Sequence, residues 1–352
     1  MIKAGVVGGT GYMGGEVLRI LLTHPQVSIA WATSRQGGDI AAYHPNLYGS
    51  GITLIHPDDI STVDVAFMAL PTAASITMAA RLLSIGCKVI DLGAAFRLQD
   101  RGEWEQIYQQ PHTDWQLSEQ AVYGINELHQ HAIKRASLIA NPGCFASAAI
   151  LAMAPLVQER IIDPEHIHIT GISGTAGAGA ELSRAAHHPE IGNNLIPYNV
   201  IDHRHSYEME QELSALNKGA TVTVQFTPVY APITRGILNI CHVIPIIDTN
   251  RESLLELYRE FYSDDPFIKI YDMPAVEGES WQYRAYPWVS AVAGSNYCHI
   301  GMDMDLKRGR IVIMSVLDSI GKGGAQVGVE NMNLMMDLPR SYGLDAYARH
   351  PA

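Results

Sequence analysis

The strongest candidate for a reactive side chain is Cys144. It lies in the stretch Ile139-Ala-Asn-Pro-Gly-Cys-Phe-Ala-Ser-Ala-Ala-Ile150. Its first residues are apolar and lead into Asn-Pro-Gly, a composition typical of a tight turn. Beyond the cysteine, small and aliphatic residues recur at helical spacing, so the sequence predicts a thiol at the start of a helix. Backbone N–H groups and the helix dipole at such a position favour the thiolate, which is the nucleophilic form. The alternative is a small buried cysteine without a chemical role.

Imidazole and guanidinium groups stand at three further turns. His203 and His205 flank an arginine just before a predicted helix, which makes His203 a candidate proton donor or acceptor. Arg97 lies in a glycine loop after an apolar strand, and Arg235 precedes a glycine where another strand begins. Each could bind an anion, the alternative being an ordinary surface ion pair. The four histidines between positions 187 and 205 lack an i, i+4 pair with a companion acid, so we expect no metal site.

A glycine-rich segment, Gly8-Gly-Thr-Gly-Tyr-Met-Gly-Gly15, follows the apolar strand predicted for Ile2 to Val7. An amphipathic helix is predicted from Glu16 to Leu22. Strand, glycine turn and helix in this order form a pyrophosphate site, because glycines let the backbone approach the phosphates and the helix start supplies N–H donors. The sequence therefore predicts that this segment binds a dinucleotide, although a glycine turn without a ligand is the alternative.

The end of the second predicted strand bears on the choice of dinucleotide. Thr33-Ser34-Arg35 stands where a fold that prefers NAD usually has an acidic residue. A hydroxyl and a guanidinium suit a 2′-phosphate, so we expect NADP(H) rather than NAD(H). Pro71 falls at the carboxyl end of another strand, where cofactors bind in such sheets. A second glycine loop, which begins with Ser173-Gly174, either lies along the nicotinamide or forms a lid.

Strands and helices alternate along the whole chain, and a length of 352 residues favours two domains. We expect an α/β protein in which residues 1–145 form a doubly wound, parallel Rossmann domain and residues 146–321 an α/β catalytic domain. The closing helix, predicted from Gly324 to Met336, is amphipathic, so residues 322–352 are expected to pack back on the first domain.

Composition narrows the possible partners. The formal net charge of −12 argues against nucleic acid or an anionic membrane as the main partner. The four cysteines form no CxxC pair, and neither a secretory leader nor a long apolar run is visible. A soluble, cytoplasmic protein with reduced thiols is the expectation.

Taken together, six motifs of this chain resemble those of the N-acetyl-gamma-glutamyl-phosphate reductases of arginine biosynthesis. They follow that family's order and cover the whole chain: Gly8-Gly-Thr-Gly-Tyr-Met-Gly-Gly, Asn141-Pro-Gly-Cys, Ser173-Gly-Thr-Ala-Gly-Ala-Gly, His203-Arg-His, Thr234-Arg-Gly and Lys322-Gly-Gly-Ala-Gln-Val-Gly-Val-Glu-Asn-Met-Asn. The resemblance implies a Rossmann domain joined to a catalytic domain of the semialdehyde-dehydrogenase type. It also implies NADPH-dependent reduction of an acyl phosphate to a semialdehyde through a cysteine thioester, and a homodimer or homotetramer.

Site residues follow from the resemblance position by position. Cys144 matches the nucleophile and His203 the acid/base. The positions that match substrate-binding residues are Arg97, Asn141, His205 and Arg235. Those that match or adjoin the cofactor site are Gly8, Thr10, Gly11, Tyr12, Met13, Gly14, Ser34, Arg35, Pro71, Ser173 and Gly174.

The chain departs from the family pattern at three places, which leaves alternatives open. Phe145-Ala146 replaces the usual residues after the thiol, and Ser319 stands where the family often has Asn. The segment Ala180 to Glu190 looks more like a sister group that reduces a carrier-bound acyl phosphate in lysine biosynthesis. An aspartate-semialdehyde dehydrogenase and a non-catalytic NADP-sensing protein are the remaining alternatives. The presence of Cys144, His203 and two candidate anion-binding arginines in one chain argues against the NADP-sensing protein.

Overall fold

A computed structural model describes residues 1–272 and 286–349, which divide into two compact units. The first unit comprises Met1–Pro142 and Gly324–Ala346, and the second comprises Gly143–Gly323 with the described residues from Tyr347 onward. The chain therefore passes between units at Pro142, three residues before the boundary expected from the sequence. None of the described helices is long and apolar enough to cross a membrane.

The first unit contains an eight-stranded sheet in the order β3-β4-β2-β1-β5-β6-β8-β7. All neighbouring strands run parallel except β3 and β4. The central strands are short apolar runs buried on both faces, as a sheet covered by helices on both sides requires. The strands are β1 (Ile2–Val7), β2 (Val27–Thr33), β3 (Gly38–Asp39), β4 (Thr53–Ile55), β5 (Val65–Met68), β6 (Lys88–Asp91), β7 (Val122–Tyr123) and β8 (Leu138–Ala140).

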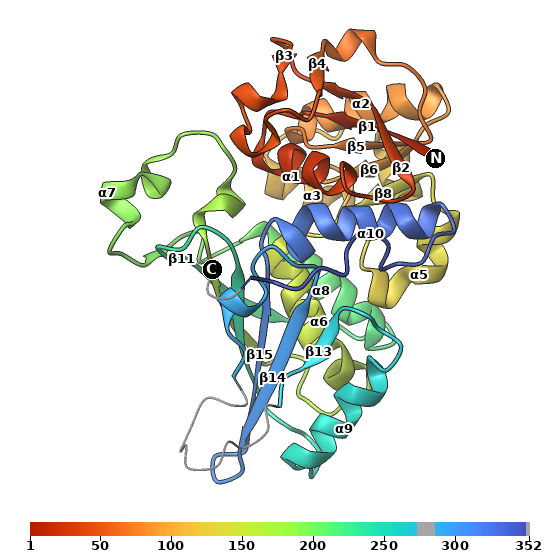
Figure 1. The fold of residues 1–352 in the computed structure, drawn as a ribbon. Coiled ribbons are helices and arrows are strands. Elements are labelled where there is room, and N and C mark those ends of the chain that lie inside the picture. The colour runs from red at the N-terminus through yellow and green to blue at the C-terminus, as the bar shows by residue number, and fades with distance from the viewer. Residues whose placement is uncertain (273–285, 350–352) are drawn as a thin grey trace. The chain divides into compact units, whose positions relative to one another are not determined.

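Six α-helices belong to the first unit, and the last of them returns from the far end of the chain (Figure 1). They are α1 (Tyr12–Leu21), α2 (Thr72–Ser84), α3 (Arg101–Tyr108), α4 (Trp115–Gln120), α5 (Asn126–Arg135) and α10 (Gln326–Met335). The return of α10 is confirmed, since it packs on α5, α1 and β6. Its predicted amphipathic character is wrong, because all ten residues are buried. Its polar side chains are bonded inside the unit instead: His24 Nε2 lies 3.0 Å from Asn333 Oδ1, and Arg340 donates to Glu330.

The second unit contains a seven-stranded mixed sheet in the order β10-β11-β9-β12-β15-β14-β13. Helices α6 (Cys144–Gln158), α8 (Arg204–Leu216) and α9 (Arg251–Phe261) pack on one face of it (Figure 1). Alternation of buried and half-buried residues along β12 follows from this one-sided cover. The remaining elements are α7 (His188–Ile191), β9 (Ile167–Ser173), β10 (Ile196–Pro197), β11 (Val224–Tyr230), β12 (Ile237–Val243), β13 (Ile268–Ile270), β14 (Cys298–Asp305), β15 (Arg310–Leu317) and a π-helical turn over Gly321–Ala325.

Helix α6 is the centre of the second unit. Alanines at five of its fifteen positions let it pack closely on β12 and β15, and every residue from Phe145 to Val157 is buried. One side chain of the sheet and one just after α9 donate hydrogen bonds to its backbone carbonyls: Ser315 donates to Ala148 at 2.7 Å, and Tyr262 to Leu151 at 2.6 Å. The first residue of α6 is consequently held in a rigid environment.

Candidate active site

Cys144 is the first residue of α6, as the sequence predicted. The preceding Gly143 is the N-cap with an extended backbone (φ −70°, ψ 144°), so the thiol stands beside the N–H groups of the first helical turn, which have no acceptor within the helix. It is half-buried, whereas the other three cysteines are buried. Burial raises the pKa of one of these, Cys241, far above its ordinary value, which leaves that sulfur an inert thiol.

Two side chains of α8 lie against the residue before the thiol. The Gly143 N–H donates to Glu208 Oε2 at 2.9 Å, and the second carboxylate oxygen is 3.8 Å from His205 Nε2. A Cβ atom on Gly143 would lie 2.5 Å from His205 Nε2, so only glycine fits there. Glu208 is fully buried. This carboxylate was not among the residues predicted from the sequence, although its i, i+3 spacing from His205 on one helix is a signal that points to it.

His203 is the N-cap of α8 and is 5% exposed. Its Nδ1 accepts the N–H of His205 at 3.2 Å, so in the neutral ring the proton is on Nε2. Burial, with the charge of the adjacent Arg204 as a second cause, lowers its pKa from 6.5 to about 4. A neutral imidazole that presents Nε2–H can donate a hydrogen bond to an oxyanion that forms beside it at physiological pH.

Aromatic rings surround the two histidines. The ring of Phe145, next to the thiol, lies 6.0 Å from the rings of both His203 and His205. Tyr198 stacks on Tyr230 at 4.1 Å and makes an edge contact with His203 at 5.6 Å. Burial first, then the hydroxyl of Tyr230 and the thiol of Cys144, raise the pKa of Tyr198, so its hydroxyl stays protonated. The departure at Phe145 from the family pattern therefore forms part of an aromatic wall around the histidines.

The depressed pKa of His203 predicts a pH dependence of stability. An unfolded chain binds a proton at this ring below pH 6.5, whereas the folded protein does so only near pH 4. The contribution of His203 to the free energy of unfolding is therefore present in full above pH 6.5. As the pH falls towards 4, the free energy of unfolding decreases by about 3 kcal/mol. We expect His203→Asn, which preserves a good N-cap, to flatten this decline in urea unfolding between pH 7 and 4.5. His166→Asn, at an exposed ring, is the control, and an unchanged slope in His203→Asn would contradict the assignment.

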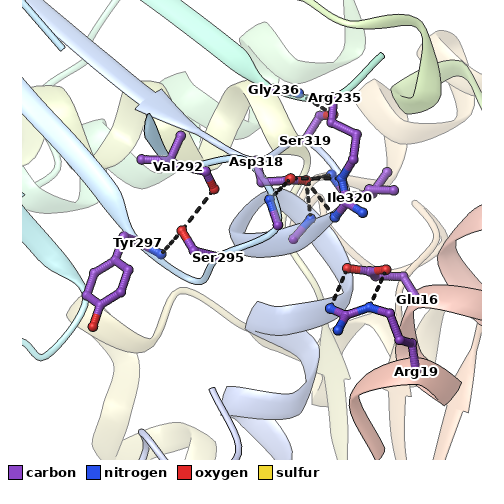
Figure 2. A network of polar contacts seen from close by, with 12 residues as sticks. Glu16, Arg19, Arg235, Gly236, Val292, Ser295, Tyr297, Asp318, Ser319 and Ile320 are labelled. Atoms are coloured by element: carbon purple, nitrogen blue, oxygen red, sulfur yellow. Dashed lines mark hydrogen bonds and ion pairs between the residues drawn. The ribbon is translucent and has the colours of Figure 1, made fainter. Parts of the chain in front are cut away.

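Arg235 lies in a loop that contacts the Ser173-Gly174 loop. Gly174 N–H donates to Gly236 O at 2.9 Å, and a Cβ on Gly174 would lie 2.6 Å from Thr234 O. Two motifs that are 60 residues apart in the sequence therefore lie together at the ends of β9 and β12. Arg235 itself forms an ion pair with the buried Asp318 (Figure 2).

The glycine-rich segment of the first unit has the shape of a phosphate-binding turn. Gly8 has a φ of +86°, and a Cβ on Gly14 would lie 2.2 Å from the carbonyl oxygen of Gly8. Helix α1 begins at Tyr12, four residues before the predicted start, because the Gly11 N-cap already opens it. The turn residues Thr10, Gly11, Tyr12 and Met13 are half-buried or exposed, which leaves this helix start accessible to an anion. These features fit a dinucleotide pyrophosphate.

Further residues expected at the cofactor site lie at the next two strand ends. Ser34 follows β2, and its hydroxyl accepts the N–H of Gly37 at 2.8 Å, while Arg35 is exposed beside it. Pro71 is the N-cap of α2 after β5. An exposed guanidinium after β2, where an acidic residue is absent, is compatible with a 2′-phosphate.

Gly14→Ala should disrupt this turn. The added methyl group cannot fit 2.2 Å from a backbone oxygen, so Gly8 or the start of α1 must shift. We expect affinity for NADPH, measured by calorimetry, to fall at least about tenfold, which corresponds to 1.4 kcal/mol. Gly102→Ala, at an exposed position in α3, should leave it unchanged. Equal affinities of the Gly14 variant and the wild type would contradict the assignment of this turn.

Arg97 and Asn141 are brought together in the first unit. Arg97 Nε donates to the Asn141 carbonyl at 2.8 Å, and both side chains are buried. Asn141 in turn donates to Gly324 O at 3.1 Å and accepts from Asn331 at 3.2 Å. The loop that carries Arg97 is folded around Asp91, which accepts the N–H groups of Gly93 and Ala95. Asn141 thus orders the backbone at the end of β8.

No group of three or more metal-binding side chains occurs among the described residues. The rings of His203 and His205 contact each other and the ring of Phe145, and His205 Nε2 also lies 3.8 Å from the carboxylate of Glu208.

Comparison with known proteins defines the class of this fold and site. Residues 3–136 match the family "Semialdehyde dehydrogenase, NAD binding domain", and residues 144–319 match "Semialdehyde dehydrogenase, dimerisation domain". Aspartate semialdehyde dehydrogenase II from Vibrio cholerae has the same fold, with a TM-score of 0.70 at 18% identity, over 96% of this chain and 98% of that one. The structure of aspartate semialdehyde dehydrogenase with NADP from Candida albicans matches with a TM-score of 0.63 at 15% identity, over 96% of this chain and 98% of that one. The two-domain fold of semialdehyde dehydrogenases is thereby confirmed.

Full-length relatives identify the particular family. N-acetyl-gamma-glutamyl-phosphate reductase from Moorella thermoacetica is 39% identical over 98% of both chains, and that from Methanopyrus kandleri is 40% identical over the whole of both. The chain belongs to the N-acetyl-gamma-glutamyl-phosphate reductase family, as the motifs indicated.

Proposed function

We propose that this protein reduces N-acetyl-gamma-glutamyl phosphate to the semialdehyde with NADPH, as a step of arginine biosynthesis. Overall, acyl phosphate, NADPH and a proton give aldehyde, NADP⁺ and phosphate. The observation that carries the proposal is a half-buried thiol at the first turn of α6, beside a buried histidine pair, in a chain of this family. The alternatives on the same scaffold are not favoured, since full-length relatives at 36–40% identity share one name.

In this mechanism Cys144 attacks the acyl carbonyl as a thiolate and phosphate leaves, which gives a thioester. N–H groups of the first turn of α6 stabilise the oxyanion of the tetrahedral intermediate. NADPH supplies the hydride that reduces the thioester. His203, neutral and protonated on Nε2, donates a hydrogen bond that stabilises the alkoxide formed by hydride addition, and the alkoxide collapses to the aldehyde as the C–S bond breaks and the thiolate is released.

The other site residues bind and orient. His205 and Glu208 hold the backbone before the thiol. The guanidinium groups of Arg97 and Arg235 are proposed to bind the phosphate and the carboxylate of the substrate, with Asn141 ordering the loop that Arg97 contacts. The glycine turn from Gly8 to Gly14 binds the pyrophosphate, and Ser34 and Arg35 bind the 2′-phosphate. Pro71, Ser173 and Gly174 are proposed to line the nicotinamide side.

An assembly of identical chains is proposed as well. The dimerisation-domain family covers residues 144–319. Opposite its helix-covered face, the sheet of the second unit carries half-exposed apolar side chains, among them Leu238, Ile240, Val312 and Met314. This face suits a homodimer or homotetramer, which light scattering would detect. A cytoplasmic location is proposed, because the chemistry needs NADPH and a reduced thiol.

The test is a comparison of substrates with the purified protein. We expect turnover of free N-acetyl-gamma-glutamyl phosphate with NADPH, and a much higher KM with NADH. Aspartyl phosphate tests for an aspartate-semialdehyde dehydrogenase, and the carrier-bound aminoadipyl phosphate tests for the sister group. A preference of at least about a hundredfold in kcat/KM for either of these, or no turnover of any of them, would overturn the proposal.

A further inference from the structure

Asp318 is a fully buried carboxylate directly after β15, and no role was predicted for it from the sequence. Its oxygens accept two N–H groups from Arg235, Nε at 2.8 Å and Nη2 at 3.1 Å. This two-point pairing fixes the plane of the guanidinium as well as its position. A buried charge is costly without such a partner, so the pair stays closed in the folded protein.

The same carboxylate also orders backbone (Figure 2). Asp318 Oδ1 accepts the N–H groups of Ile320 at 3.0 Å and of Gly321 at 2.8 Å, and Oδ2 accepts that of Gly294. One side chain therefore joins the Arg235 turn, the Gly294 loop and the turn after β15. The neighbouring Ser319 strengthens the junction, since its hydroxyl accepts the N–H of Gly236 at 3.1 Å.

This junction extends to the nucleophile. The carbonyl of Asp318 accepts the N–H of Gly323 at 2.8 Å, and a Cβ on Gly323 would lie 2.8 Å from Cys144 Cβ. The turn after β15 is therefore in contact with the first residue of α6. Displacement of that turn would move the wall against which the thiol packs.

The two partners of the ion pair differ in exposure. The side chain of Asp318 is 0% exposed, whereas that of Arg235 is 26% exposed. Solutes can therefore reach the guanidinium of Arg235, whereas they cannot reach the carboxylate of Asp318. Because Asp318 compensates the charge of Arg235, the guanidinium attracts an anion chiefly through the fixed direction of its N–H groups.

We propose that Asp318 is a positioning residue for the reaction: it aims Arg235 at an anionic group of the substrate and holds the turn that packs against Cys144. The inference rests on the proposed function and deepens it, because it assigns recognition of a substrate anion to an oriented ion pair.

Two substitutions of Asp318 separate its two tasks. Asp318→Asn retains an oxygen for the N–H groups of Ile320 and Gly321 but removes the charge partner of Arg235. Asp318→Ala removes both. Arg235→Met and the double variant Asp318→Asn/Arg235→Met complete a cycle. Asp305→Asn, at an exposed ion pair with Arg308 in the same unit, is the matched control for loss of one carboxylate.

Each variant is assayed in the reverse direction for the KM of aldehyde and of phosphate, for kcat, and for the rate at which iodoacetamide alkylates the thiol. We expect Arg235→Met to raise one of the two KM values about tenfold or more, and Asp318→Asn to raise the same one. The double variant should show no further increase. Alkylation should change only in Asp318→Ala, and Asp305→Asn should match the wild type throughout.

Additive effects in the double variant, or an unchanged KM in Asp318→Asn beside a raised one in Arg235→Met, would overturn the inference. So would a loss of melting temperature in Asp318→Asn with both KM values intact, since a purely structural role predicts that result. These outcomes are distinct from failure of the proposed function, which would appear as no phosphate-dependent turnover by the wild type and by Asp305→Asn.

Discussion

Cys144→Ser is expected to lower phosphate-dependent reduction of NADP⁺ with the aldehyde by more than about a thousandfold, since the variant loses the group that forms the covalent intermediate. A serine hydroxyl occupies nearly the same space but remains protonated at neutral pH, and the helix start that favours a thiolate cannot ionise it. The melting temperature should change little, because the side chain is only half-buried. Steady-state kinetics with each variant measure the effect.

Two comparisons make this result specific. Cys87→Ser alters another free cysteine, which is buried in the first unit and is not one of the proposed site residues. Its turnover should remain near that of the wild type in the fraction that folds. Iodoacetamide at neutral pH should inactivate both the wild type and Cys87→Ser. If Cys144→Ser reduced NADP⁺ at a rate within about tenfold of the wild type, no thioester would form in the reaction.

Gly143→Ala is expected to lower kcat/KM about a hundredfold. The added methyl group would lie 2.5 Å from His205 Nε2 and 2.9 Å from Glu208 Oε1, so the start of α6 or the side chains of α8 must move. A displacement of about 1 Å at a catalytic group costs roughly this much in rate. The residue has an ordinary extended backbone, so the loss would come from contact rather than from backbone strain.

The control for this variant is Gly102→Ala, where the methyl group enters an exposed face of α3. Circular dichroism and the melting temperature of both variants distinguish a displaced site from an unfolded chain. Full activity in a folded Gly143→Ala protein would mean that His205 and Glu208 do not constrain the thiol. Binding of NADPH serves as a second control and should stay intact, because the turn from Gly8 to Gly14 belongs to the other unit.

Features of the site that depend on neighbours in sequence were predictable. Asn-Pro-Gly before Cys144 indicated a helix that starts at the thiol, and α6 begins at that residue. The strand and turn around Gly8 followed from composition in the same way. Small errors arose at helix ends, as at Tyr12, because glycine in the first turn of α1 concealed four helical residues.

Features that depend on distant parts of the chain were not predictable from one sequence. Glu208 reads as an ordinary surface acid in an amphipathic helix, yet it is buried and bonded to Gly143, 65 residues earlier. Asp318 follows a predicted strand, and Arg235 was predicted to bind an anion or to form a surface ion pair. Nothing in the local sequence indicated that the two side chains, 83 residues apart, pair with each other. Local spacing carries no information about which strand ends a sheet brings together.

By itself, the sequence determined the chemical groups and the local geometry that activates them: a thiol at a helix start, a glycine turn that a dinucleotide can approach, and a histidine that caps a helix. Tertiary structure decided which charges are paired and which backbone is held, as with Glu208 on Gly143 and Asp318 on Arg235. The physical reason is that turn and helix preferences act between residues a few positions apart, whereas the burial and pairing of a carboxylate depend on whatever the rest of the chain packs against it.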